Sequence, residues 1–185
     1  MSDRQDELYR QAGEQFAPAI ARLAATMERD RERARDLEQD IHAELWRSFA
    51  RFRGDCALKT WVFRVAHNVA ADHVGRDARI PASADVDVEE LELSAVHGDA
   101  EGEAAQRHAL ARAREMIRKL PMIDAQIVFL WLEGESAKEI AEVVGLDANA
   151  VRMRIHRAKN RLAKAFEAPA APSPSPTPTQ PQESA

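Results

Sequence analysis

Apolar residues recur every three or four positions over much of the chain, which is the spacing of one face of an α-helix. In the first part of the chain this spacing predicts one helix over 7–29 and a second over 33–52. The pattern stops at Gly54 and Asp55 and then resumes, which predicts a third helix over 58–76. Three helices with facing apolar stripes can bury one small core, so we expect a helical bundle.

The third predicted helix carries two different faces. Its apolar stripe consists of Val62, Val65, Ala66, Val69 and Ala70. A polar row occupies another face because its members repeat every four residues, at Arg64, Asn68, Asp72 and Arg76. Most polar rows on amphipathic helices are solvated. Spacing alone therefore favours a solvated face, with a site for a polar partner as the alternative.

Helical periodicity fades over the segment 79–104, where Pro81 interrupts any helix and the composition turns acidic. A loop of that length is uncommon inside one compact domain. We therefore expect 79–104 to be a flexible linker between two small domains, 5–78 and 105–167. Residues 168–185 are mostly Pro, Ser, Thr and Ala without a large hydrophobe, which is typical of a disordered tail.

The second domain is expected to begin with a helix that ends before Pro121, followed by an apolar run over 127–132. Beyond this run, Ser136 and Glu139 have the spacing of a capping box, which predicts a short helix over 137–144.

The sequence after the short helix predicts a tight turn and a longer helix. Gly145 supplies the turn, and Asp147 is the expected N-cap of a helix over 148–166. A short capped helix, a glycine turn and a basic second helix are the pattern of a helix-turn-helix unit. We expect Val151 and Ile155 to pack the second helix against the domain. The polar or exposed positions that remain are Arg152, Met153, Arg154, His156, Arg157 and Lys159.

Arginine neutralises phosphates and also binds guanine through two hydrogen bonds, so a basic second helix is suited to DNA. The alternative is a plain helical hairpin with a solvated basic face.

Composition supports an all-α protein. The 185 residues include seven glycines and one tyrosine, while Ala, Leu, Arg and Glu are abundant, as helices prefer. The net charge of -5 hides an uneven distribution. Eight acidic residues and no Lys or Arg lie within 85–103, whereas six basic residues and one acidic residue lie within 146–166. A basic segment of this kind is a candidate for contact with nucleic acid.

Several classes of chemistry are disfavoured by the sequence. With Cys56 as its single cysteine, the chain has no intramolecular disulfide, and the six histidines form no metal-ligand grouping with cysteine. We expect no metal, no cofactor, no catalytic residues and no enzymatic activity, because no nucleophile stands with a base and an orienting group. A signal segment and a run of about 20 apolar residues are both missing, so we expect a cytoplasmic protein without membrane insertion.

Both predicted domains resemble those of an extracytoplasmic-function (ECF) sigma factor, a small class of the sigma-70 family that acts with bacterial RNA polymerase. The first resembles sigma region two through Asp36-Leu37-Glu38-Gln39-Asp40, Phe52-Arg53-Gly54, Thr60-Trp61-Val62 and Val65-Ala66-His67-Asn68. The second resembles sigma region four through Leu120-Pro121, Glu139-Ile140-Ala141, the Gly145 turn and Arg157-Ala158-Lys159.

The resemblance implies that the protein binds core RNA polymerase, directs it to promoters and helps to melt the minus-ten element. The polymerase contact would be made by Asp36, Leu37, Gln39 and Asp40, with Leu37 as a buried anchor. The minus-ten set would be Lys59, Trp61, Arg64, Asn68, Asp72 and Arg76. The minus-thirty-five duplex would be read by Arg152, Met153, His156 and Arg157, with Arg154 and Lys159 on phosphates.

Some points depart from the family pattern or stay open. Arg33 and Arg35 stand where the family is usually acidic, which is expected to weaken attraction to a basic polymerase surface. Trp61 is either a wedge at the edge of the duplex or a core residue. An anti-sigma factor or another regulator is a further expected partner.

Two other functions compete with the sigma interpretation. A helix-turn-helix regulator would bind its duplex site without core polymerase, and it would leave the first domain without a role. An adaptor that does not bind DNA would show no dependence of DNA binding on salt. Neither alternative accounts for both domains.

Overall fold

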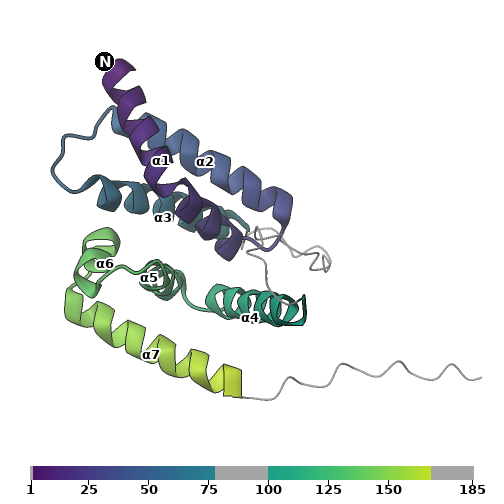
Figure 1. Ribbon diagram of the computed structural model, residues 1–185. Helices are drawn as coiled ribbons and strands as arrows, with labels where there is room; N and C mark the ends of the chain where they lie inside the picture. Colours follow the sequence, from purple (N-terminus) through teal and green to yellow (C-terminus); the bar gives the residue numbers. More distant parts are fainter. Residues whose placement is uncertain (1, 78–99, 168–185) are drawn as a thin grey trace, which may run out of the picture.

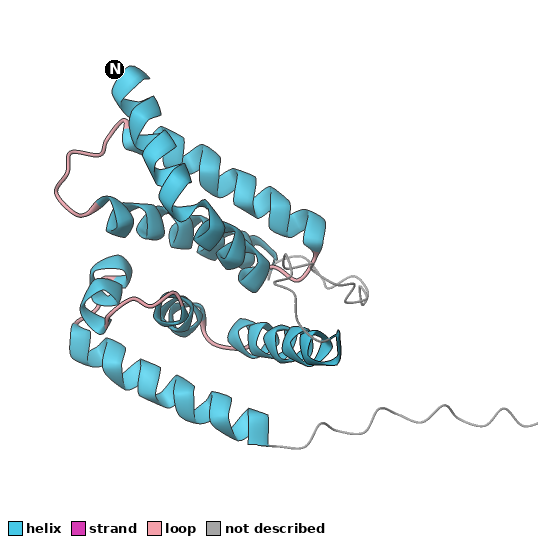
Figure 2. Ribbon diagram, in the orientation of Figure 1, coloured by secondary structure: helices cyan, strands magenta, loops and turns pink. Residues whose placement is uncertain are grey.

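The computed structural model describes residues 2–77 and 100–167, and within these ranges helix is the only regular secondary structure (Figure 2). The helices form two units stacked one on the other (Figure 1). The first unit contains α1 (Ser2–Met27), α2 (Arg31–Phe49) and α3 (Leu58–Asp77). The second contains α4 (Ala100–Arg118), α5 (Met122–Leu132), α6 (Ala137–Val144) and α7 (Ala148–Glu167). The predicted all-α class is confirmed.

The first unit is the predicted three-helix bundle. Its core includes Leu23, Leu37, Ile41 and Val62, each with no exposed surface. Burial of such a side chain contributes about 1.5–3 kcal/mol relative to leaving it in water, so this shared core is what holds the three helices together.

The helix boundaries of the first unit differ slightly from the predicted ones. α1 begins five residues earlier than expected, because its first turns are tied to the end of α2. Asp6 accepts a hydrogen bond of 2.9 Å from the Trp46 indole, and Gln5 donates one of 2.6 Å to the Trp46 carbonyl. α2 ends three residues early, and Gly54 then turns the chain with a φ of 86°.

In the second unit, α5 is central because it is buried on almost every side. Six consecutive residues, from Ala125 to Leu130, are buried. The sequence predicted only residues 127–132 as an element here, since Asp124 and Gln126 interrupt the apolar pattern. The structure begins the helix at Met122 and satisfies both polar groups: Gln126 donates to the His67 carbonyl oxygen, and Asp124 accepts from Arg154.

The predicted linker can be compared with the structure only in part. Residues 78–99 lie outside the described residues, as does the predicted tail 168–185. Residues 100–104 were expected to belong to the linker, but they form the first turn of α4. The second unit therefore starts earlier than the loss of large apolar residues suggested, since small residues such as Ala104 still continue a helix.

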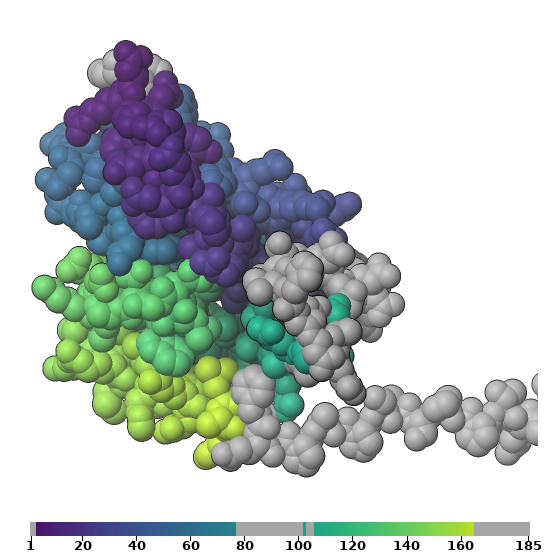
Figure 3. All heavy atoms as spheres, in the orientation of Figure 1, coloured from purple at the N-terminus to yellow at the C-terminus, as the bar shows by residue number. Residues whose placement is uncertain are grey.

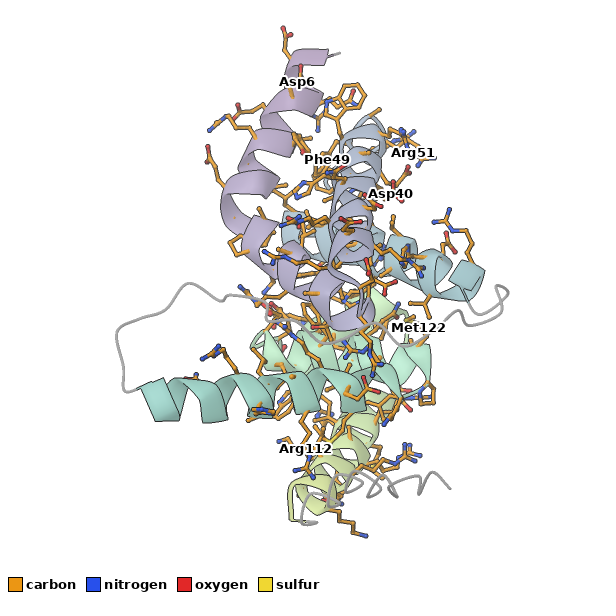
Figure 4. All side chains as sticks on the ribbon, turned by 90° about the vertical axis from the view of Figure 1, so that its right-hand side faces the viewer. Asp6, Asp40, Phe49, Arg51, Arg112 and Met122 are labelled. Carbon is orange, nitrogen blue, oxygen red and sulfur yellow. The ribbon has the colours of Figure 1, made fainter. Side chains whose placement is uncertain are left out.

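The two units are in direct contact, although the sequence predicted only that a linker joins them. α1 packs on α4, and α3 packs on α6. The space-filling view shows the first unit seated on the second (Figure 3). Met122, at the start of α5, lies where the two units meet (Figure 4). Buried residues of both units form one continuous apolar cluster.

Candidate nucleic-acid interface

The helix-turn-helix geometry follows from local capping contacts that the sequence predicted. The Ser136 hydroxyl accepts from the Glu139 amide at 3.3 Å, and the Glu139 carboxylate accepts from the Ser136 amide at 2.9 Å. Gly145 ends α6 in the left-handed conformation, at a φ of 71°. One Asp147 carboxylate oxygen then accepts from the amides of Asn149 and Ala150, both at 2.9 Å, and starts α7. The capping box, the glycine turn and the N-cap are confirmed.

One face of α7 packs and the other is open. Val151 has no exposed surface, and Ile155 is buried beside it. The exposed face carries all four side chains predicted to read duplex DNA, which are Arg152, Met153, His156 and Arg157. Met153 is 57% exposed, which is unusual for so large an apolar side chain. An open face with both charge and an apolar contact suits the edges of base pairs.

Arg154 and Lys159, unlike these four residues, contact α5. The Arg154 guanidinium forms an ion pair of 2.6 Å with Asp124 of α5. The Lys159 ammonium lies 4.4 Å from the centre of the Trp131 ring, also on α5. Both cations therefore hold α7 against α5. The structure gives each a packing role in addition to the predicted contact with phosphates.

A groove between α2 and α3 gathers most of the predicted minus-ten residues. The polar row of α3 forms one wall, as the four-residue repeat predicted. The other wall comes from α2 and the turn after it (Figure 4). The groove is lined by Asp40, Glu44, Arg47, Ser48, Arg51, Trp61, Arg64, Val65, Asn68, Val69, Asp72 and Arg76. Four arginines and three carboxylates line it, and the arginines suit a phosphate backbone.

The apolar stripe of α3 is narrower than predicted. Val62, Ala66 and Ala70 have no exposed surface, but Val65 and Val69 are half-buried and line the groove. These two valines still pack against the core, as the predicted stripe requires, but they do so at its edge, beside the groove. They give the groove an apolar floor, against which a base can pack.

Trp61 packs against the core, as one of the two sequence interpretations expects, and it also lines the groove. Its indole nitrogen donates a hydrogen bond of 3.0 Å to the Ser48 hydroxyl, and its ring lies 5.3 Å from that of Phe52. These contacts join the start of α3 to the end of α2.

The predicted polymerase contact lies on α2. Asp36, Gln39 and Asp40 are exposed, whereas Leu37 has no exposed surface and belongs to the core of its own unit. Leu37 therefore acts on this face indirectly, by fixing the helix that presents the two carboxylates.

Two of the predicted minus-ten cations bind the second unit, which the sequence did not indicate. The Lys59 ammonium lies 2.7 Å from the Glu135 carboxylate and 2.9 Å from that of Glu139. The Arg64 guanidinium donates a hydrogen bond of 2.6 Å to the Glu142 carbonyl oxygen. Hydrogen bonds from Lys59 and then from Ser136 lower the pKa of Glu139 to about 2. Asn68, Asp72 and Arg76 remain exposed.

His67 is the buried polar side chain at the contact between the units. The rings of Phe63 and Phe129 lie near its ring, with centroids 6.5 and 5.7 Å away. Neither ring nitrogen has a hydrogen-bond partner among the described residues. Burial lowers the pKa of His67 to about 3, so the imidazole is neutral at ordinary pH.

Neither described range holds a group of three or more His, Cys, Asp or Glu side chains arranged for a metal ion. None of the helices described has both the length and the apolar character of a membrane span.

Both units match known protein families. Residues 14–80 match the family model described as sigma-70 region 2, and residues 110–162 match that described as sigma-70, region 4. The RNA polymerase sigma-H factor of Pseudomonas aeruginosa is 31% identical over 145 residues, covering 75% of each chain. The ECF RNA polymerase sigma-E factor of Escherichia coli K12 is 32% identical over 135 residues, covering 69% of this chain and 70% of its own.

Solved structures share the fold at lower identity. CnrH, solved with the cytosolic domain of CnrY, is 22% identical with a TM-score of 0.64, covering 90% of this chain and 98% of its own. RpoE of Bartonella quintana, solved with the anti-sigma factor NepR, is 21% identical with a TM-score of 0.63, covering 86% of this chain and 96% of its own.

The two matched regions, in this order along one chain, define a protein of the sigma-70 class. The chain belongs to the sigma-70 family as an ECF sigma factor, which binds core RNA polymerase and directs it to promoter DNA. A helix-turn-helix regulator without the polymerase is not favoured, because it leaves residues 14–80 unexplained. The family is not one of enzymes.

Proposed function

We propose that the α2–α3 groove holds the melted minus-ten strand, that the exposed face of α7 reads the minus-thirty-five duplex, and that exposed α2 residues bind core polymerase. The observation that carries this proposal is the groove itself, in which the row from Arg64 to Arg76 faces a second wall that carries Arg47 and Arg51. The domains would be 5–78 for polymerase and minus-ten binding and 105–167 for minus-thirty-five binding, joined by 79–104.

Each part of the groove has a suitable chemical role. Arginines at the two walls would neutralise phosphates. The exposed Asn68 amide carries both donors and an acceptor, so it can bind a base edge from the groove wall. Trp61 and the half-buried valines offer apolar surface to a base that has left the stack. Unstacking costs a few kcal/mol, and these contacts would offset part of it without ATP hydrolysis.

The polymerase surface follows from exposure and charge. Asp36 and Asp40 lie one helical turn apart on α2 with Gln39 between them, and all three are open to a partner. Carboxylates at this spacing suit a basic helical partner. The side chains of Arg33 and Arg35 are exposed on the same helix, which would reduce that attraction.

The cytoplasm is the expected location, because the relatives are RNA polymerase factors and that enzyme works there. An anti-sigma factor is a candidate regulator, since RpoE of Bartonella quintana was solved with one. We expect neither cofactor nor catalysis.

Run-off transcription with core polymerase on a panel of promoters tests this function. Asp36→Arg should reduce core binding in a pull-down and reduce transcription by the same factor. Glu14→Arg makes the same change of charge on an exposed position of α1 and should change neither. A wild-type protein that does not bind core polymerase in the pull-down, or equal behaviour of the two variants, would contradict the proposed surface.

A further inference from the structure

Three polar bridges, here called the latch, join the first unit to the loop and short helix that open the helix-turn-helix. Arg22 of α1 binds the Glu133 carboxylate through two hydrogen bonds, of 2.8 and 2.6 Å. Lys59 of α3 binds Glu135 and Glu139, and Arg64 of α3 binds the carbonyl oxygen of Glu142. Figure 1 shows α6 beneath the start of α3 in this arrangement.

The latch occupies one DNA surface and leaves the other open. Lys59 and Arg64 belong to the proposed minus-ten set, and both are bound by oxygens of the second unit. On α7, the side chains of Arg152 and Arg157 face solvent. In the closed arrangement the duplex reader is therefore available, while two cations of the proposed minus-ten set are occupied.

The oxygens of the latch have the chemistry of the ligand they exclude. A carboxylate and a phosphate both offer anionic oxygens, and arginine binds either through a planar pair of N–H groups. The Arg22–Glu133 pair has this two-bond geometry, and the Lys59 ammonium lies between two carboxylates, as it would between phosphates. The carboxylates of Glu135 and Glu139 and the phosphates of a DNA strand thus compete for Lys59, while the Glu142 carbonyl oxygen occupies Arg64.

The closed state is poised to open because its bridges lie at the rim. The Arg22 side chain is 46% exposed and that of Glu133 is 14% exposed, so water still reaches this pair and limits its contribution to about 1 kcal/mol. The buried part of the contact includes His67, whose ring nitrogens make no hydrogen bond in the described structure. An unsatisfied polar group opposes burial, so modest competing interactions are sufficient to shift the equilibrium.

We propose that Glu135 and Glu139 compete with single-stranded DNA for Lys59, and that the Arg22–Glu133 pair holds them in place. The closed sigma factor then binds duplex through α7 but holds a melted strand only after the latch opens. This regulation rests on the proposed function of the groove. It also predicts that the two DNA activities of the chain respond differently to the same substitution.

Arg22→Glu tests the latch in the full-length chain. It removes an exposed cation that belongs to neither proposed DNA set, and it places two carboxylates against each other at Glu133. Binding of a fluorescent 12-nucleotide single strand of mixed sequence should rise by about fivefold, the equivalent of 1 kcal/mol. The substitution makes the chain more negative, so a change of net charge alone would weaken binding. Affinity for a 20-base-pair duplex of mixed sequence should stay within about twofold of the wild-type value.

The double variant Arg22→Glu/Glu133→Arg is the matched control, because it restores the pair with its charges exchanged and keeps the wild-type net charge. Small-angle scattering should show a larger radius of gyration for Arg22→Glu and the wild-type value for the double variant. The salt dependence of strand binding should be steeper in the open variant by a slope of about 1.4, for two phosphate contacts at about 0.7 each.

The possible results distinguish failure of the latch proposal from failure of the proposed minus-ten function. An unchanged radius for Arg22→Glu would overturn the latch whatever the DNA measurements show. An enlarged radius without a gain in strand binding would overturn the competition between carboxylates and DNA, and would count against the minus-ten assignment of Lys59 and Arg64. Equal gains for strand and duplex would also contradict the proposal, because the latch covers one surface only.

Discussion

Gln126 of α5 donates a hydrogen bond of 3.1 Å to the backbone carbonyl of His67 on α3, while the His67 ring stays without a polar partner in the described structure. The interface between the two units is thus anchored through the backbone of a histidine whose side chain is held neutral by burial. A proton on that ring would have to be buried as a charge.

Stability should therefore fall in acid. The pKa of His67 is about 3 in the folded protein and 6.5 without burial, so the unfolded chain binds the proton more tightly. The contribution of the neutral ring is complete above pH 6.5 and is lost progressively toward pH 3, by about 1.4 kcal/mol per pH unit. Denaturant unfolding at about pH 7 and pH 5 should show a loss of about 2 kcal/mol.

His67→Met is the control for this window, since it keeps an apolar side chain beside the two phenylalanines and does not titrate. Its stability should be nearly flat over the same range. Carboxylates do not account for the window. Burial opposes ionisation of Glu115, but hydrogen bonds from Arg29 and Arg118 lower its pKa from 4.5 to about 2, so its contribution is lost only below the measured range of pH 7 to pH 5. A wild-type slope retained in His67→Met would show that another group titrates.

Asn68→Ala should impair promoter opening without impairing folding. Asn68 is exposed on the groove wall, so the substitution leaves no cavity and no buried group unpaired. Loss of one hydrogen bond to a base, at about 1 kcal/mol, should lower open-complex formation about fivefold in a permanganate footprint. Val62→Asp, at a position with no exposed surface, should instead unfold the first unit. Normal opening by Asn68→Ala would favour a solvated face for this row.

Two arginines of α7 should respond differently to removal. Arg157→Ala takes away an exposed cation and should weaken duplex binding, with the salt slope falling by about 0.9 and the melting temperature unchanged. Arg154→Ala breaks a half-buried ion pair with Asp124 and should destabilise the second unit by about 1 kcal/mol. DNA-binding titrations and thermal melts of the two variants measure these two effects. Equal stability of both variants would show that the Arg154–Asp124 ion pair does not contribute to the free energy of unfolding.

Gly145→Ala should destabilise the helix-turn-helix through the backbone alone. A Cβ at this position would meet nothing within 4 Å, but the φ of 71° is one that alanine rarely adopts. The expected cost is about 1–2 kcal/mol. Gly145→Asn should cost less, because asparagine tolerates the left-handed conformation better. Urea unfolding of the three proteins tests the order, and an alanine variant as stable as the wild type would exclude a backbone cause.

Features that depend on neighbours in sequence were predictable. The capping box of Ser136 and Glu139, the Gly145 turn and the Asp147 cap each lie within a few residues, and all three are present. The polar row of α3 also follows from a local repeat, and it lines one groove. Its assignment to DNA rests on resemblance and stays a prediction.

Contacts between distant residues were not predictable from periodicity. Arg22 and Glu133 are 111 positions apart, and nothing near either residue indicates the other. α5 was shortened for a similar reason, since Asp124 and Gln126 look like surface residues until their partners on other helices are known. The partial exposure of Val65 and Val69 at the edge of the core was also not predictable, because a stripe defined by spacing does not show how far a neighbouring helix covers it.

Glu139 divides its work between its two carboxylate oxygens. One accepts from the Ser136 amide at 2.9 Å within α6, and the other receives the Lys59 ammonium at 2.9 Å. If Lys59 moves away, the hydrogen bond between Glu139 and the Ser136 amide stays in place. The helix-turn-helix therefore keeps its capping box when the first unit separates from it. In many multidomain chains, separating two domains also destabilises the domain that is released. In this protein the capping of α6 does not depend on the contact with the first unit, so we expect the helix-turn-helix to keep its structure when the units separate.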